Sequence, residues 1–271
     1  MSSVAIAGRP IVDNRKVRNE NPIRVFVIVI AILLLVLAAE LIFHLLISPR
    51  MLIKRIDVSI DGSLLLDEQS LLAIAEVGNS PYYFEIDTES IVARLESYPP
   101  IRVAQVSKSF PDKLKISVWG RTPLVLALVE GESGTIPVTF DSEGVIFQIG
   151  ESVANFDLPA VSGLTFASVR LGQRIARPLA TFLDDLQRIR LVEPALFNLI
   201  SEIKFVTKNH SGYEVILFAK SYPARVLVGS SIDAELMKRI VLVLDVLSQQ
   251  EEQFTGEIDF RTNDIVMRER E

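Results

Sequence analysis

The stretch SKSFPDKLKISVWGRTP, from Ser107 to Pro123, constrains the fold more than any other part of the sequence. Its second half alternates between polar positions and the apolar residues Leu114, Ile116 and Val118. Such alternation is typical of a strand with one buried and one solvated face. Pro111-Asp112 supplies turn residues, and Pro123 lacks the amide hydrogen that further pairing would need. The stretch therefore predicts the end of a β-hairpin.

The residues before this hairpin predict one strand and two helices. Apolar residues recur from Ile53 to Ile60, as expected of a strand. Asp67 and Asp87 each precede an apolar helical pattern, where a carboxylate can accept hydrogen bonds from the first helical amides. We expect Gly78 to end the first helix in a left-handed conformation and Pro99-Pro100 to end the second. Two strands then follow, at Ile101–Phe110 and Lys113–Trp119. The predicted order is β-α-α-β-β.

Between Val25 and Ile47 the only ionisable residues are Glu40 and His44. About 20 residues of helix cross the hydrocarbon core of a bilayer, so this run predicts a transmembrane helix. Residues 1–24 hold five basic and two acidic side chains, which favours a cytoplasmic N-terminus. The alternative is a signal peptide cleaved near Ala38, although the apolar run continues beyond that point.

Glu40 and His44 are four residues apart and so share one face of the predicted membrane helix. One interpretation places both side chains at the outer interface, where water reaches them. The other makes them a proton relay or a contact with a partner helix, because idle ionisable groups are costly inside a membrane.

The composition of this 271-residue chain excludes several kinds of site and argues against one class of partner. The chain has no cysteine, which excludes disulfides, cysteine-zinc sites and thiol nucleophiles. The net charge is −6, and the residues after the apolar run carry −8. This acidic body, with scattered basic residues, argues against nucleic acid as a partner.

From Leu124 onward strands dominate the predicted structure. Ile136–Phe140 and Val145–Ile149 flank the turn residues Asp141 to Gly144. After Pro178 a helix is predicted from apolar residues that share one face: Leu179, Phe182, Leu183, Leu186 and Ile189. Further strands are expected at Ile200–Val206, Tyr213–Phe218, Ala224–Val228, Gly256–Arg261 and Asn263–Met267. Ser230 and Asp233 have the spacing of a capping box ahead of a helix that runs through Leu247.

No motif in the sequence indicates catalysis. His44 and His210 do not have metal-ligand spacing, and we find neither a nucleophile elbow nor a phosphate-binding loop. The acidic pairs Asp184-Asp185 and Glu251-Glu252 are interpreted as solvated faces. We therefore predict no catalytic, cofactor-binding or metal-binding residue. Four aromatic residues could form an exposed contact patch, although core or loop anchoring is favoured: Tyr82, Tyr83, Phe84 and Trp119.

Several of these fragments together resemble the FtsQ/DivIB family of bacterial division proteins and its POTRA domain. The first strand resembles the family in Ile53, Ile56, Val58 and Gly62. The hairpin and its exit resemble it in Ile101, Ala104, Val106, Pro111, Leu114, Ile116, Val118, Arg121 and Pro123. Further likeness lies in Leu158-Pro159 with Gly163, and in Ile258-Asp259-Phe260-Arg261. The family usually has Glu before the hairpin Arg, whereas this chain has Gly120.

The resemblance implies an α+β fold with one N-terminal transmembrane helix. The POTRA domain (β-α-α-β-β) is followed by a second mixed α/β domain rich in antiparallel strands. The expected divisions are a cytoplasmic tail (1–24), a transmembrane helix (25–47), the POTRA domain (51–121), an FtsQ-type β domain (122–268) and a C-terminal end (269–271). Gly62, Pro111, Arg121 and Pro123 are expected to have structural roles in the POTRA motif.

The resemblance also implies a non-enzymatic scaffold of the division septum in the inner membrane. It would recruit FtsB-like and FtsL-like single-pass proteins and the septal peptidoglycan synthesis machinery. The partner-binding edge strand maps to Thr262, Asn263, Asp264, Ile265, Val266, Met267 and Arg268. We expect Val266→Pro to break partner binding. The alternatives are a POTRA-containing secretion or outer-membrane assembly factor and a membrane-anchored cell-wall enzyme.

Overall fold

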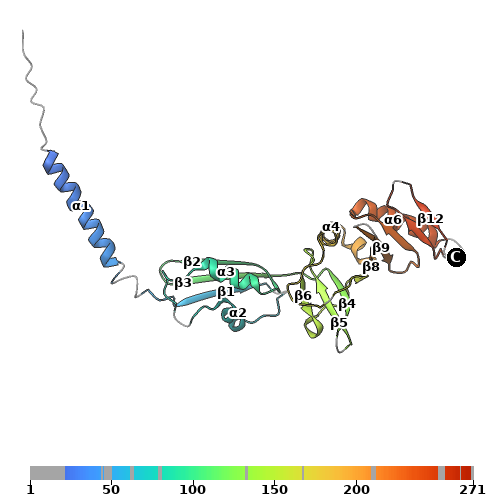
Figure 1. The fold of residues 1–271 in the computed structure, drawn as a ribbon, viewed down its shortest axis with the longest axis horizontal. Coiled ribbons are helices and arrows are strands. Elements are labelled where there is room, and N and C mark those ends of the chain that lie inside the picture. The colour runs from blue at the N-terminus through green and yellow to red at the C-terminus, as the bar shows by residue number, and fades with distance from the viewer. Residues whose placement is uncertain are drawn as a thin grey trace, which may run out of the picture.

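The computed structural model describes residues 22–43, 45, 51–61, 64–78, 81–131, 134–166, 168–208, 212–249, 254–262 and 264–269. Helix α1 (Pro22–Ile42) leads away from the strand-rich remainder of the chain, and the C-terminus lies at the opposite end (Figure 1). Within the described residues, Ile23–Ile42 is the one helix long and apolar enough to cross a membrane, with a mean hydropathy of 3.2. Its length and hydropathy make it a candidate membrane helix, as the sequence predicts, although it begins at Pro22 rather than at Val25.

Five elements follow α1 and form the first folded region. They are β1 (Arg55–Ile60), α2 (Glu68–Ala75), α3 (Thr88–Ser97), β2 (Ile101–Ser109) and β3 (Lys113–Gly120). The sheet order is β1-β3-β2, with β1 parallel and β2 antiparallel to β3. Leu114, Ile116 and Val118 on β3 are buried against both helices, as their alternation predicts. The predicted β-α-α-β-β order is confirmed.

The N-terminal caps of α2 and α3 are as predicted, but the C-terminal end of α2 is not. Asp67 and Asp87 accept hydrogen bonds from the first amides of α2 and α3, as predicted. The prediction that Gly78 ends α2 is wrong. Glu76 takes the left-handed conformation instead, with φ 51°. This earlier stop lets Val77 pack against the core while its amide bonds to the carbonyl of Leu72.

A nine-stranded mixed sheet forms the second folded region, in the order β12-β11-β10-β9-β8-β7-β4-β5-β6. Its strands are β4 (Val125–Gly131), β5 (Gly134–Phe140), β6 (Ile146–Ile149), β7 (Ala160–Ser162), β8 (Ile200–Thr207), β9 (Tyr213–Ala219), β10 (Arg225–Val228), β11 (Glu257–Asp259) and β12 (Val266–Arg268). Its helices are α4 (Arg177–Val192), α5 (Pro194–Asn198) and α6 (Ala234–Ser248). Strands β4 and β7 and helix α5 had no separate prediction.

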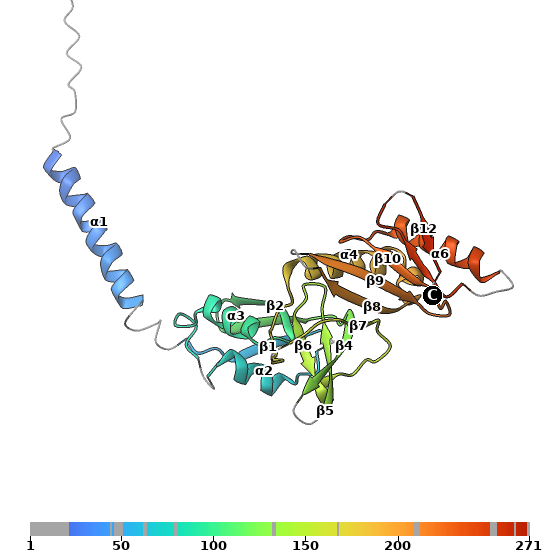
Figure 2. The same cartoon turned by 45° about the vertical axis from the view of Figure 1, so that its right-hand side comes forward.

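Helices α4 and α6 bury their apolar faces in one continuous hydrophobic cluster with this sheet. All five predicted core residues of α4 are buried. For α6 the predicted capping box is wrong. Asp233 itself is the N-cap and accepts a 2.7 Å hydrogen bond from the Leu236 amide, so Ser230 lies outside the helix. The turned view in Figure 2 shows α4 and α6 beside the strands β8 to β12.

Buried residues in the described part of the chain form two separate hydrophobic clusters. One joins residues from Ile53 to Val118, and the other joins residues from Leu124 to Phe260. Arg121 lies between the two clusters in sequence. The limits 51–121 and 122–268 remain the domain division that we propose.

Candidate functional site

Strand β12 forms one end of the nine-stranded sheet. In the part of the chain that the structure describes it pairs only with β11, in antiparallel register: Glu257 with Arg268, Ile258 with Met267, and Asp259 with Val266. An edge strand leaves backbone amides and carbonyls on its outer side, which can pair with an added strand. The C-terminal strand is therefore a candidate docking site.

The hydrogen bonds of the neighbouring strand show which residues of β12 direct their backbone outward. The Arg225 amide donates to the Gly256 carbonyl (3.0 Å), and the Phe260 amide donates to the Leu227 carbonyl (2.9 Å). Backbone groups of successive strand residues point to opposite sides, so β11 turns its even-numbered residues toward β10 and its odd-numbered ones toward β12.

It follows that Asp259 and Val266 face each other across the β11–β12 ladder, as do Glu257 and Arg268. Met267, between Val266 and Arg268, directs its amide and carbonyl away from β11. The outward-facing backbone of β12 is therefore centred on Met267.

The side chains of this strand are also exposed. Ile265, Val266 and Met267 have exposed fractions of 41%, 43% and 54%. None of these three side chains packs into the core of the sheet. Both faces of β12 offer apolar side chains beside the free backbone edge.

The turn before β12 is held by ion pairs that the sequence did not predict. Arg261 donates through Nε to Asp259 (2.8 Å) and also pairs with Glu214 on β9. In the same turn Thr262 Oγ1 donates to the Asp264 carbonyl (2.9 Å). Arg261 thus fixes the path by which the chain enters β12. Asn263, another predicted site residue, lies outside the described residues.

Gly256 lets β11 and β12 approach closely. A Cβ atom built on Gly256 would lie 2.2 Å from the Arg268 carbonyl oxygen and 2.4 Å from the Phe254 ring. Contacts below 3.0 Å are not tolerated without movement of one partner. The position of the edge strand therefore depends on a glycine at this position.

A second constellation joins the two folded regions at Arg121. Its Nε donates to the Pro99 carbonyl (2.9 Å), and its guanidinium pairs with Asp141 and Glu143, the latter at 3.1 Å. Asp141 and Glu143 lie in the turn between β5 and β6. Burial by itself would lower the pKa of Arg121, but hydrogen bonds and charge from Asp141 and Glu143 raise it above its ordinary value. Arg121 is thus a charged bridge across the junction.

The remaining motif residues lie around this junction and at the far turn of the hairpin. Pro123 follows β3, and its carbonyl accepts a 2.6 Å hydrogen bond from Arg190 of α4. Pro111 lies in the β2–β3 turn, after a cis peptide bond. Gly62 lies outside the described residues.

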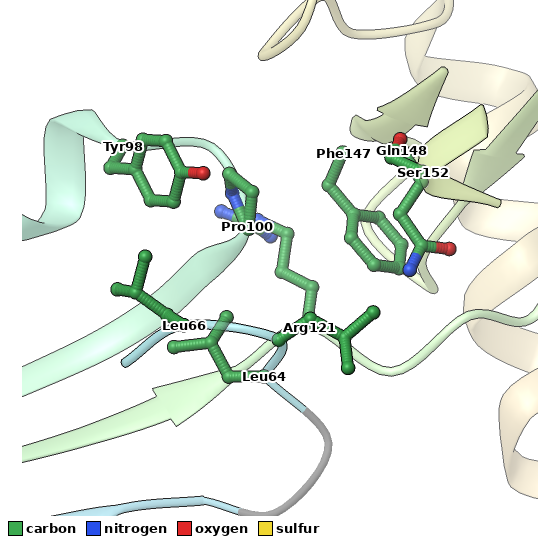
Figure 3. Close-up of a pocket in the computed structure, with 9 residues that line it drawn as sticks. Leu64, Leu66, Tyr98, Pro100, Arg121, Phe147, Gln148 and Ser152 are labelled. Atoms are coloured by element: carbon green, nitrogen blue, oxygen red, sulfur yellow. The ribbon is translucent and has the colours of Figure 1, made fainter. Parts of the chain in front are cut away.

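A cleft of about 90 Å³ lies beside Arg121, between the two regions. Figure 3 shows Leu64, Leu66, Tyr98 and Pro100 on one side and Phe147 on the other. Small-molecule sites usually enclose about 300–1,000 Å³, so this cleft is too small for a typical metabolite. We interpret it as a packing seam of the junction.

The other predicted candidates are not brought together. Glu40 is exposed on α1, and His44 lies outside the described residues, as do His210 and Glu251-Glu252. Asp184 and Asp185 both contact Arg188 on α4. Trp119 is 44% exposed and is not a core residue. Tyr82 and Phe84, at 39% and 42% exposed, lie in the loop between α2 and α3, in keeping with the loop anchoring that the sequence favours.

The anchor and the first folded region define the class of protein: a POTRA-domain protein with a candidate N-terminal membrane helix. The family described as "POTRA domain, FtsQ-type" matches residues 56–119. These residues run from β1 to the end of β3.

Three relatives illustrate the similarity beyond that domain, and each is named cell division protein FtsQ. The protein of Mycolicibacterium smegmatis is 31% identical over 147 residues, 54% of this chain and 42% of the relative. That of Syntrophotalea carbinolica is 26% identical over 107 residues, 40% of this chain and 36% of the relative. That of Geobacter sp. (strain M21) is 27% identical over 190 residues, 68% of this chain and 65% of the relative.

The chain thus spans about two fifths of the length of the Syntrophotalea and Mycolicibacterium relatives. The family match and the shared names agree with each other and with the fold. The chain contains an FtsQ-type POTRA domain and is similar to proteins named cell division protein FtsQ.

Proposed function

We propose that this protein is a non-enzymatic, membrane-anchored scaffold of bacterial cell division that binds a partner strand at the free edge of β12. The names of its relatives support the division role. The observation that carries the docking mechanism is the outward-facing backbone at Met267, flanked by exposed apolar side chains. Main-chain pairing would supply affinity, and the side chains would supply specificity.

The proposed orientation places residues 1–24 in the cytoplasm and both folded regions on the outer side of the inner membrane. The excess of basic residues before α1 supports it, because positively charged flanks remain on the cytoplasmic side. The proposed partners are FtsB-like and FtsL-like single-pass proteins and, through them, the septal peptidoglycan synthesis machinery. Such proteins would lie in the same membrane, with extracytoplasmic segments able to reach β12.

Partner addition can be tested with the full chain and its FtsB-like partner, both reconstituted in nanodiscs. Met267→Pro removes the outward amide without removing a hydrogen bond to β11, and we expect at least a tenfold loss of affinity. Met267→Ala keeps the amide and loses only the side chain, so it serves as the matched control and should weaken binding less. Unchanged affinity of Met267→Pro would exclude strand addition at this edge.

The geometry of the β11–β12 pair changes what the substitution Val266→Pro would test. Val266 faces Asp259, so Val266→Pro should disrupt the β11–β12 pair itself. Loss of binding in that variant would not separate docking from local unfolding. The comparison of Met267→Pro with Met267→Ala avoids this ambiguity.

The cellular part of the proposal has its own test. A fluorescent fusion at the N-terminus should form a midcell band before constriction begins. An even membrane signal throughout the cell cycle would contradict septal recruitment. The purified full chain should not cleave peptidoglycan, and measurable turnover would contradict the non-enzymatic part of the proposal.

A further inference from the structure

A cluster of aromatic side chains lies at the end of the first folded region that is nearest to α1. We call Tyr82, Tyr83, Phe84 and Phe110 the aromatic tip. Tyr83 contacts Phe84 and Phe110 edge to face, with ring centroids 5.2 and 6.0 Å apart. Phe110 is 69% exposed, although it follows the last residue of a well-paired strand. Several exposed aromatic rings at one place indicate a surface that contacts a partner.

Backbone hydrogen bonds attach the aromatic tip to the segment that leads from the membrane helix. The Tyr83 amide donates to the Met51 carbonyl, and the Ile53 amide donates to the Pro81 carbonyl, both at 2.9 Å. Leu52 and Tyr82 form an antiparallel bridge between these hydrogen bonds. The loop of the aromatic tip is therefore attached to the residues that enter this region from the side of α1.

The tip also contacts the membrane helix segment directly. The rings of Phe43, just after α1, and Phe84 are 5.6 Å apart in an edge-to-face arrangement. Seven residues separate Phe43 from Met51, and an extended chain advances at most about 3.6 Å per residue. The aromatic tip thus cannot lie more than about 30 Å from the end of the membrane helix.

The basic residues near the aromatic tip suit a bilayer surface, but they would not be the main contribution to binding it. Lys108 places its ammonium 5.4 Å from the Tyr83 ring centre and donates to the carbonyls of Tyr83 and Ile86. Lys54 and Arg55 are exposed at the start of β1, whose backbone contacts Asp112 in the hairpin turn, while Asp112 and Glu85 of the tip loop carry opposite charge. Basic residues near an anionic leaflet are each worth about 1 kcal/mol, so the near balance leaves the aromatic rings as the main contribution.

We propose that the aromatic tip inserts into the headgroup region of the membrane that holds α1. Tyr rings at this depth keep an apolar body in the boundary region and a hydroxyl in water, as in interfacial aromatic belts, and the Phe rings add buried apolar area. Anchoring at two points, α1 and the tip, restricts the first folded region to one orientation on the bilayer. The region then holds β12 at a set height above the membrane instead of swinging on a tether. This inference does not depend on the identity of the partner at β12.

The sole tryptophan makes a direct test possible with the full chain. Trp119 lies near the other end of β3, about 20 Å from Lys113 at 3.3 Å per residue, and is exposed. The test variant carries Trp119→Phe and Phe110→Trp, which moves the single fluorophore to the tip. Wild type is the matched control, with its fluorophore away from the membrane. Both chains are reconstituted in liposomes of phosphatidylethanolamine and phosphatidylglycerol that contain lipids brominated on the acyl chain.

The expected result is a blue-shifted emission of the introduced tryptophan and at least twofold quenching by brominated lipid, with little quenching of Trp119 in wild type. Strong quenching by aqueous iodide without bromine quenching would overturn the proposal. So would shielding that appears only when a single-pass partner is reconstituted with the chain, because the tip would then bind protein. Circular dichroism of the double variant checks that its fold is retained, and Phe84→Trp with Trp119→Phe repeats the test should that variant fail to fold.

Discussion

Arg121 at the exit of β3 and Asp141 in the β5–β6 turn form an ion pair that joins the two folded regions. Their side chains are only 9% and 4% exposed. Asp141 also accepts hydrogen bonds from the amides of Glu143 (3.0 Å) and Val145 (2.8 Å). Both buried charges are therefore satisfied by several partners, which is the condition under which a buried ion pair is tolerated.

Removal of the arginine should destabilise the junction strongly. Arg121→Met leaves the Asp141 carboxylate buried without its cation, and such changes cost about 3–5 kcal/mol. The measurement is urea unfolding of the full chain in detergent micelles, followed by the fluorescence of Trp119, two residues away.

The control for this prediction is Arg188→Met on α4. Arg188 also pairs with two carboxylates, but its side chain is 68% exposed. Exposed pairs contribute about 0–1 kcal/mol, so this variant should unfold almost as wild type does. Equal effects of the two substitutions would show that the junction pair contributes no more than a surface contact.

The junction should also lose stability in acid through Glu143. Burial by itself would raise the pKa of Glu143, but its contacts with Arg121 and Arg102 lower it below the ordinary value of 4.5. A carboxylate with a lowered folded-state pKa stabilises the fold above its unfolded pKa, and this contribution is lost as the pH falls through the folded pKa.

We therefore expect Glu143→Gln to destabilise the full chain at pH 7 and to match wild type once the pH falls well below about 4.5. The effect should be on the order of 1 kcal/mol or less, since 36% of the side chain is exposed. Thermal unfolding of both proteins between pH 7 and pH 3 measures it. In an Arg121→Met background the same substitution should have a smaller effect, with the remainder due to Arg102, and an undiminished difference would show that Arg121 is not the main partner.

Gly163 should not accept a side chain. Its φ is +79°, and a Cβ atom there would lie 2.0 Å from the Phe205 carbonyl oxygen on β8. Gly163→Ala must therefore strain the backbone and separate β7 from β8, at a cost of about 1–3 kcal/mol or more. Gly78→Ala is the matched control, because nothing lies within 4 Å of its added atom. Chemical denaturation of both variants compares them, and similar midpoints would contradict the close approach at β7.

Gly256→Ala should loosen the edge strand without unfolding the sheet. The added atom would displace the Arg268 carbonyl, since β12 has no neighbour on its outer side among the described residues. Hydrogen exchange of the Val266 and Arg268 amides, which face β11, should become faster, while exchange in β8 and β9 stays unchanged. Gly229→Ala, with open space around its added atom, should leave all of these rates as in wild type.

The order of elements in the first folded region could be predicted because its signals are local. The alternation on β3 and the carboxylates of Asp67 and Asp87 act within one strand or one helical turn. The end of α2 could not be predicted from Gly78, since the burial of Val77 against distant residues decides where the helix stops. For α6 the spacing of Ser230 and Asp233 was misleading, because Asp233 itself caps the helix by accepting from the Leu236 amide.

That one apolar helix precedes a β-α-α-β-β unit and a strand-rich region could be predicted from the sequence, because periodicity reveals which face of an element is buried. Periodicity does not reveal which surface that face meets. Three further features come from the packing of distant segments: Arg121 pairs with Asp141, Met267 rather than Val266 directs its backbone outward, and Phe110 is exposed beside Tyr83. Each of these depends on the register or packing of segments far apart in the chain, where no local pattern records the partner.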